Sequence, residues 1–182
     1  MLSGKRKKTQ GILKRSIKQK KGLKMKTYVL TLSKFFPYNH VRKGERTLFE
    51  KAIKEWQVFQ VESFYPYPKI HTIRSNYELW HKRFQEIEKG NAQLSIRQWS
   101  GIPYRSKQEI ICNLTKDDGI GMQKLEVRGF HITHPMYVDG RCIDSRDLAR
   151  NDGLSELDWM NWFKEYDLQE PLAVIHFTDF RY

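Results

Sequence analysis

The sequence predicts an α+β domain in which helices flank a small β-barrel or curled sheet. Segments with apolar residues every three or four positions indicate amphipathic helices, and many short β-rich runs indicate strands. The two kinds of segment do not alternate strictly, which argues against a parallel α/β sheet. With 182 residues, 39% of them hydrophobic, the chain is long enough for one domain with a hydrophobic core.

The first half of the folded region is expected to contain two helices and two or three strands. Tyr28–Leu32 is a β-rich run and predicts the first strand. Thr47–Trp56 carries its apolar residues on one helical face and predicts a helix, and Val58–Phe64 alternates and predicts a strand that prolines end. His71–Arg74 follows as an extended stretch. Asn76–Lys89 repeats large side chains at helical spacing and predicts a second helix, stopped by a glycine.

Strand patterns then recur at short intervals along the chain. They cover Gln93–Trp99, Glu109–Leu114 and Lys124–Ile132, and turn-rich segments separate them. A closing strand is expected over Leu172–Phe177. This density of short strands favours a barrel or curled sheet.

The last helix is expected to begin near Ser155. Ser155 and Asp158 resemble a capping box, with Asp in place of the usual Glu. Leu157, Met160 and Trp162-Phe163 are expected to face the core.

The positive charge is concentrated in one segment. The formal net charge is +12, but residues 1–26 hold 11 of the 33 Lys and Arg residues and no acid. We therefore predict a basic arm over residues 1–26, disordered on its own and suited to phosphate backbone, with translation from Met25 as the alternative. Residues 27–182 form the expected domain. Because they are nearly neutral, nucleic-acid recognition there depends on local patches.

Several classes of protein are not expected from this sequence. No apolar run is long enough to span a membrane, and the basic N-terminus has no apolar stretch of a secretory signal behind it. Cys112 and Cys142 are interpreted as reduced thiols of a cytoplasmic protein. The only close histidine pair, His131 and His134, lacks further ligands, so neither a metal nor a cofactor is expected. Asp117-Asp118-Gly119 is interpreted as a turn rather than a calcium loop.

The stretch Lys69-Ile-His-Thr72-Ile-Arg74 has the pattern Lys-x-x-Thr-x-Arg. This pattern resembles the signature of ASCH domains, which belong to the PUA-like superfamily. Further segments resemble an ASCH-related group found in bacterial and prophage genomes, over about residues 28–180: Leu30–Ser33, Phe36-Pro37, Arg42–Glu45, Leu94–Gly101, Pro103–Gln108, Asn151–Gly153 and Trp162-Phe163. The resemblance implies a small PUA-like β-barrel with flanking helices.

The resemblance also implies a function in nucleic-acid or nucleoside chemistry. ASCH domains are thought to bind or act on RNA or modified nucleosides, and one branch hydrolyses the acetyl group of N4-acetylcytidine. That branch uses a Lys and a Thr of the signature, which Lys69 and Thr72 match, and a Glu before the late helix. Here Arg150 stands near the position of that Glu, and Asp152 is the nearest carboxylate. Tyr67-Pro68 stands where the family usually has Gly.

The residues themselves allow two interpretations of the signature. A metal-free amidohydrolase needs a nucleophile, a base and oxyanion donors. Thr72 supplies a hydroxyl, and Lys69 could act as base if burial and Arg74 lower its pKa. On a straight strand Thr72 and Arg74 share a face and Lys69 does not, so a bend is required. In the alternative, Arg74 pairs with an acid, Thr72 bonds to backbone and Lys69 is solvated.

Three neighbouring residues also have two interpretations each. Asp152 is either the catalytic carboxylate or a cap for the first turn of the following helix. Glu109 is a second candidate carboxylate or an exposed charge at a strand start. His71 is expected either to line the pocket or to pack beside Trp80.

Aromatic and basic residues interleave around one predicted turn, as nucleic-acid binding requires. Trp99 or Tyr104 could stack on a base while Arg97, Arg105 and Lys107 hold phosphates. In the alternative, Trp99 belongs to the core and the basic residues are ordinary surface.

Three functional hypotheses follow. The first is recognition of RNA or a modified nucleoside by a PUA-like pocket. The second is metal-independent hydrolysis of an acylated nucleoside such as N4-acetylcytidine by Lys69, Thr72 and Asp152. The third is a prophage accessory protein that makes only protein contacts. Salt-sensitive binding favours the first, and turnover of a free nucleoside favours the second.

Overall fold

The computed structural model describes residues 25–59, 67–129 and 134–182, and for residues 58 and 59 it describes the backbone alone. The elements are β1 (Lys26–Leu32), α1 (Phe49–Phe59), β2 (His71–Arg74), α2 (Tyr77–Glu88), β3 (Ala92–Trp99), β4 (Gln108–Leu114), the short 3-10 helix η1 (Lys116–Asp118), β5 (Gly121–Val127), β6 (Met136–Val138), β7 (Arg141–Ile143), α3 (Ser145–Asn151), α4 (Glu156–Phe163) and β8 (Leu172–His176). The predicted α+β class is confirmed.

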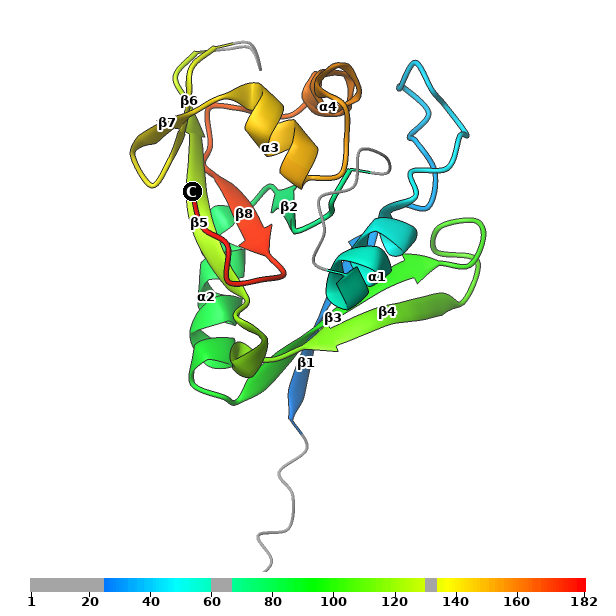
Figure 1. Cartoon of the computed structure of the whole chain (residues 1–182), viewed down its shortest axis with the longest axis vertical. Coiled ribbons are helices and arrows are strands. Elements are labelled where there is room, and N and C mark those ends of the chain that lie inside the picture. The colour runs from blue at the N-terminus through cyan, green and yellow to red at the C-terminus, as the bar shows by residue number, and fades with distance from the viewer. Residues whose placement is uncertain (1–24, 60–66, 130–133) are drawn as a thin grey trace, which may run out of the picture.

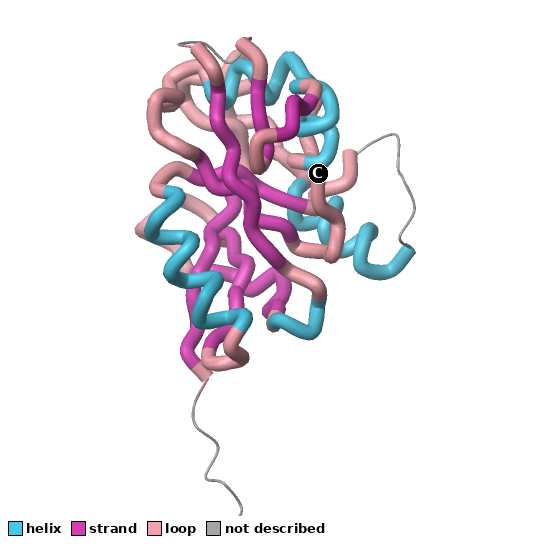
Figure 2. The backbone as a smooth tube through the Cα atoms, turned by 90° about the vertical axis from the view of Figure 1, so that its left-hand side faces the viewer, coloured by secondary structure: helices cyan, strands magenta, loops and turns pink. Residues whose placement is uncertain are grey.

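The described strands form two separate sheets rather than one closed barrel. One sheet has the order β1-β3-β4, with β1 parallel to β3, and the other has the order β2-β8-β5-β6-β7 and is antiparallel throughout. Figure 1 shows α1 across β3 and β4, whereas α3 and α4 lie near β2 and β8. Helix α2 contacts β3 of one sheet and β5 and β8 of the other, and Figure 2 shows it packed along the strands.

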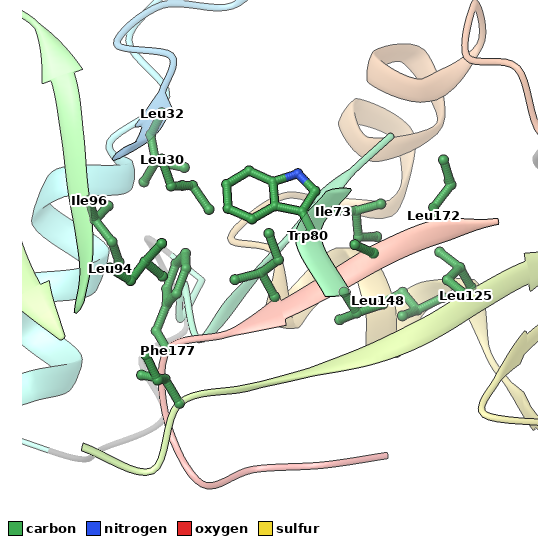
Figure 3. Close-up of a cluster of buried hydrophobic side chains, with 14 of the residues drawn as sticks. Leu30, Leu32, Ile73, Trp80, Leu94, Ile96, Leu125, Leu148, Leu172 and Phe177 are labelled. Atoms are coloured by element: carbon green, nitrogen blue, oxygen red, sulfur yellow. The ribbon is translucent and has the colours of Figure 1, made fainter. Parts of the chain in front are cut away.

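The hydrophobic core lies between the two sheets. Trp80 of α2 stands at its centre, between leucines of β1 and Ile73 of β2 (Figure 3). The strands bury alternate residues where one face is covered, as in Leu30 and Leu32 of β1. Strand β8 is buried along its whole length because neighbours cover both of its faces.

Some predicted boundaries were wrong. Helix α1 continues to Phe59, so the strand predicted over Val58–Phe64 does not begin at 58, and the rest of that range lies outside the described residues. Strand β5 begins at Gly121, because it pairs with β8 from that residue on, and it ends at Val127. Of the predicted Lys124–Ile132, residues 128 and 129 are not strand, and residues 130 to 132 are outside the described part.

Strands β6 and β7 and helix α3 were not predicted from the sequence. Strands β6 and β7 have three residues each, too few for an alternating pattern, and they form because each pairs with a neighbour. Helix α3 has seven residues and buries only Leu148 and Ala149, so it lacks an amphipathic stripe. The Asp144 side chain caps its N-terminus through the Arg146 N–H.

Helix α4 begins as predicted, and of the residues expected to face the core only Leu157 does not. The Ser155 hydroxyl accepts the backbone N–H of Asp158, so the predicted N-cap is confirmed. The Asp158 carboxylate is directed at Arg42, which donates to it at 2.8 Å. Leu157 is 67% exposed, contrary to the prediction, because a helix starting at Glu156 turns Trp159 toward the core instead. Phe163 is buried as predicted, and Met160 and Trp162 are partly buried against the core.

No helix among the described residues is long and apolar enough to cross a bilayer. Cys112, which is half-buried, and Cys142, which is exposed, are both free thiols.

Candidate functional site

Lys69, Thr72, Arg74 and Asp152 come together at one end of β2. Lys69 precedes the strand and forms an isolated bridge with Asp152, so it leaves the alternation of β2 itself. Its Nζ lies 3.5 Å from Thr72 Oγ1, and Arg74 Nη1 donates to the same oxygen at 3.1 Å. The convergence that the signature required is therefore present.

The Lys69 amine is held between two groups of one residue. It donates to the backbone carbonyl of Asp152 at 2.7 Å and forms an ion pair with the Asp152 carboxylate. Its Nζ also lies 4.2 Å from the centroid of the Phe49 ring. Lys69 is only 2% exposed, so the alternative of a solvated lysine is wrong.

Asp152 does not cap the helix that follows it. It is the C-cap residue of α3, and Ser155 takes the N-cap position of α4. The Asp152 side chain is left free to turn toward Lys69. Gly153 makes this turn possible, because its φ of +79° favours glycine and a Cβ there would lie 3.0 Å from Lys69 Cδ.

Burial pushes the ion pair toward its neutral form from both sides. It lowers the pKa of Lys69 to about 8, an effect that Arg74 reinforces and the charge of Asp152 opposes. Burial raises the pKa of the Asp152 carboxyl, against the charges of Lys69 and Arg74 and a hydrogen bond from Thr72. Such opposed shifts are typical of groups that exchange protons in catalysis.

Arg74 is held by backbone carbonyls rather than by an acid. Its Nη2 donates to the carbonyl of Thr31 at 2.9 Å, and its Nη1 donates to its neighbour Ile73 at 2.9 Å. Burial lowers the pKa of Arg74. These contacts fix the guanidinium beside the Thr72 hydroxyl.

The four residues line a cavity of about 170 Å³. This is smaller than the roughly 300–1,000 Å³ of pockets for drug-sized ligands, and it suits a group the size of one base. The remaining wall comes from the end of β1, α1, α4 and the residues around them: Thr31, Leu32, Ser33, Phe49, Leu154, Trp162, Phe163 and Tyr166. The sequence analysis named none of these as site residues, although it placed Trp162-Phe163 in the family resemblance.

His71 was predicted as a binding residue, but it lies on the other face of β2. It is fully buried, and its ring contacts the rings of His176 and Tyr182. Strand alternation explains the placement, because Thr72 and Arg74 point into the cavity and His71 must point away. Burial lowers the pKa of His71 well below its usual range.

The predicted nucleic-acid-binding residues lie on the β3–β4 hairpin, next to the cavity but outside its wall. Trp99 is half-buried, and its ring centroid lies 5.3 Å from that of Tyr104, which is 89% exposed. Arg105 and Lys107 are exposed beside them, whereas Arg97 is half-buried and donates to Ser95 Oγ at 2.9 Å.

Strand pairing connects this hairpin to the cavity. Thr31 and Leu32, which line the cavity, pair with Arg97 and Gln98 of β3. Glu109, at the start of β4, has a side chain 53% exposed and is not part of the cavity wall described above.

No group of three or more His, Cys, Asp or Glu residues in the described parts of the chain could hold a metal ion. Comparison of this chain with family models, curated proteins and solved structures gave no match.

Proposed function

We propose that the cavity at Lys69 is the active site of a metal-independent amidohydrolase acting on an acylated nucleoside such as N4-acetylcytidine. One observation carries the proposal: a buried amine with a pKa near 8 lies against both a hydroxyl and a carboxylate. At pH 7 about a tenth of such an amine is neutral, compared with less than about a thousandth at an ordinary lysine pKa.

The hydrogen bonds of Lys69 aim its lone pair at Thr72. As an ammonium it donates to the Asp152 carbonyl, the Asp152 carboxylate and Thr72 Oγ1. As a neutral amine it has only two protons, which Asp152 can accept, so the lone pair faces Thr72 Oγ1 and takes its proton when the hydroxyl turns away from the Asp152 carboxylate. Lys69 is then placed to act as general base for a Thr72 nucleophile.

The reaction proceeds through an acyl ester on Thr72. Thr72 Oγ1 attacks the carbonyl carbon of the amide while its proton passes to Lys69, and the Arg74 guanidinium stabilises the oxyanion. When the C–N bond breaks, the leaving amine takes the proton from Lys69. Water then attacks the ester, passes a proton through Lys69 to Thr72 Oγ1 and releases the carboxylic acid.

The shape of the cavity favours a small planar substrate. Its volume of about 170 Å³ accepts a single base more readily than a stretch of strand. Phe49, Trp162 and Tyr166 offer apolar ring surface for stacking. Asp152 takes the part that the family's Glu has in the resemblance.

We also propose that the chain is an ASCH domain with an incomplete PUA-like barrel. The convergence of Lys69, Thr72 and Arg74 supports this assignment, as does the contact of α2 with strands of both sheets.

A second candidate function is recognition of RNA or a modified nucleoside without turnover. The observation that favours it is Tyr104, a residue that is 89% exposed and has a φ of +64°, a strained value for a bulky residue. Together with Trp99, Arg105 and Lys107 it forms a surface suited to stacking bases and holding phosphates. Residues 1–24 of the basic segment lie outside the described residues and would add affinity that does not depend on sequence, whereas Lys26, which was predicted to belong to this arm, begins β1 and pairs with Glu86.

The test is a turnover assay with the full chain and N4-acetylcytidine, following cytidine by chromatography. The proposal predicts that three substitutions each reduce this release at least about 100-fold: Lys69→Met, Thr72→Val and Asp152→Asn. Lys124→Met is the matched control, because Lys124 pairs with Glu126 on the surface. Release that survives Lys69→Met contradicts it.

Absence of release from folded wild-type protein shifts the weight to recognition. Titration with single-stranded RNA at two salt concentrations, with Tyr104→Ser and Arg105→Ser as variants, then separates binding from a protein that makes only protein contacts.

A further inference from the structure

The segment after β8 folds back along β5, as Figure 1 shows at the red end of the chain. The backbone N–H of Tyr182 donates to Gln123 Oε1 at 2.9 Å, and Arg181 Nη2 donates to the carbonyl of Gly119 at 2.9 Å. A Cβ at Gly121 would overlap the Arg181 guanidinium in its present position. The segment is thereby anchored at Tyr182 to β5 and at Arg181 to Gly119, just before β5.

This anchoring places the Tyr182 ring over two buried histidines. His71 and His176 stand opposite each other on β2 and β8, with ring centroids 5.6 Å apart. The Tyr182 ring lies 5.7 Å from His71 and 5.9 Å from His176. These residues occupy the face of β2 opposite the candidate active site.

The Tyr182 hydroxyl connects β2 to α3. It lies 2.7 Å from His71 Nε2, accepts Asn151 Nδ2 at 3.0 Å and donates to the carbonyl of Asp147 at 3.3 Å. With its one proton directed to Asp147, the oxygen accepts the proton of His71 Nε2 as well. His71 Nδ1 is buried and has no partner in the described structure. In this tautomer it carries no proton, so no hydrogen-bond donor is left unsatisfied.

Two of the three residues that the hydroxyl contacts are chain neighbours of residues of the candidate site. Asn151 precedes Asp152, and His71 precedes Thr72. The backbone N–H of Ile70 also donates to the carbonyl of Asn151 at 3.0 Å, which draws the two segments together beside Lys69. The Tyr182 hydroxyl therefore fixes the distance between the end of α3 and the start of β2, from the face of β2 opposite the cavity.

We propose that Tyr182 is a positioning residue, whose hydroxyl holds the end of α3 against β2 and so maintains the spacing of Asp152 and Thr72 around Lys69. Its catalytic importance rests on the proposed function, whereas its effect on the geometry does not. Loss of the hydroxyl leaves the donor of the buried His71 and that of the half-buried Asn151 without an acceptor. The two segments then separate until water reaches the donors, and the burial of Lys69 decreases.

The test is Tyr182→Phe, which keeps the ring and removes the oxygen. The ionisation of Lys69 is followed by NMR of isotope-labelled lysine side chains, with Lys69→Met to assign the signal. We expect the measured pKa of Lys69 to rise by about one, a tenfold change in its acid dissociation constant, because the amine loses part of its burial. In the turnover assay kcat should fall about tenfold while KM changes less than about twofold.

Phe180→Leu is the matched control. Phe180 packs on the rings of Tyr182 and His176, at 5.0 and 6.0 Å, and bears no hydroxyl. This variant should lower stability and leave both the Lys69 titration and kcat unchanged. If Tyr182→Phe titrates like the wild type, or if Phe180→Leu gives the same shift, the proposal is wrong.

A wild-type protein without turnover would refute the proposed function alone, since the titration still decides the role of Tyr182. If Tyr182→Phe fails to fold, Asn151→Ala removes one of the same hydrogen bonds and should raise the Lys69 pKa by a smaller amount. An unchanged titration in Asn151→Ala would then overturn the proposal.

Discussion

Replacing Asp152 by asparagine should destabilise the protein more than replacing Lys69 by methionine, although the two residues form one ion pair. Asp152→Asn leaves the cations of Lys69 and Arg74 buried side by side. Lys69→Met leaves the Asp152 carboxylate near Arg74, whose charge favours the ionised carboxylate. Removing one partner of a buried pair costs about 3–5 kcal/mol. We expect Asp152→Asn at the upper end of this range and Lys69→Met at or below the lower end.

The structure also predicts how the larger loss depends on pH. In Asp152→Asn, Lys69 loses the carboxylate charge that raises its pKa, so its folded-state pKa falls below the present value of about 8. The unfolded chain then binds more protons than the folded chain up to the ordinary pKa of 10.5, and stability rises with pH. At about 1.36 kcal/mol per pH unit, holding Lys69 neutral costs at most about 5 kcal/mol at pH 7 and about 2 kcal/mol at pH 9.

Urea unfolding at pH 7 and pH 9 measures both effects, with the buried Trp159 as fluorescence reporter. The double variant Lys69→Met/Asp152→Asn should lose less stability than the two single losses together, because neither buried charge of the pair remains. A loss for Asp152→Asn that is equal at both pH values, or strict additivity in the double variant, would refute the reasoning.

Three further predictions concern the surroundings of the site. Gly153→Ala should lower the free energy of unfolding by about 2 kcal/mol or more and turnover at least tenfold, because the added Cβ meets the Lys69 side chain. Gly140 has a similar φ but open space around it, so Gly140→Ala is the control. Urea unfolding should show a loss of only about 1 kcal/mol for Gly140→Ala, with no change in turnover. His176→Phe should flatten the acid side of the stability curve. Burial lowers the pKa of His176 from 6.5 to about 3. This group should therefore lower wild-type stability by about 1.4 kcal/mol per pH unit as the pH drops from 6.5 to 3. If urea unfolding at pH 6, 5 and 4 gives wild type and His176→Phe the same dependence of stability on pH, the assignment is wrong. Turnover should rise with pH to a plateau with an apparent pKa of about 8, because the base must be neutral; a rate that falls over pH 7 to 9 contradicts a role for Lys69 as base.

The roles of Asp152 show where sequence reasoning reaches its limit. Asp152 lies three residues before Ser155, where the last helix is expected to begin, and acidic side chains just before a helix often cap its first turn. Ser155 takes that position instead, and Asp152 ends a seven-residue helix that has too few apolar residues to be recognised. The capping alternative for Asp152 therefore arose because helix α3 was not predicted.

The sequence by itself determined the α+β class, most of the longer strands and helices, the N-cap at Ser155 and the candidates Lys69, Thr72 and Asp152. These features depend on neighbours within about four residues, through side-chain alternation, helical spacing and capping. It also indicated that Thr72 and Arg74 share a face of β2.

Only the tertiary structure decided which of these residues meet. Lys69 and Asp152 are 83 positions apart, and their contact depends on the docking of α3 against β2. Packing of the C-terminal segment likewise brings Tyr182 onto His71, which lies 111 positions earlier in the chain. Strand pairing also decided that the described strands form two sheets rather than one closed barrel. Contacts between such distant residues are set by packing and burial, for which the local pattern of the chain carries no signal.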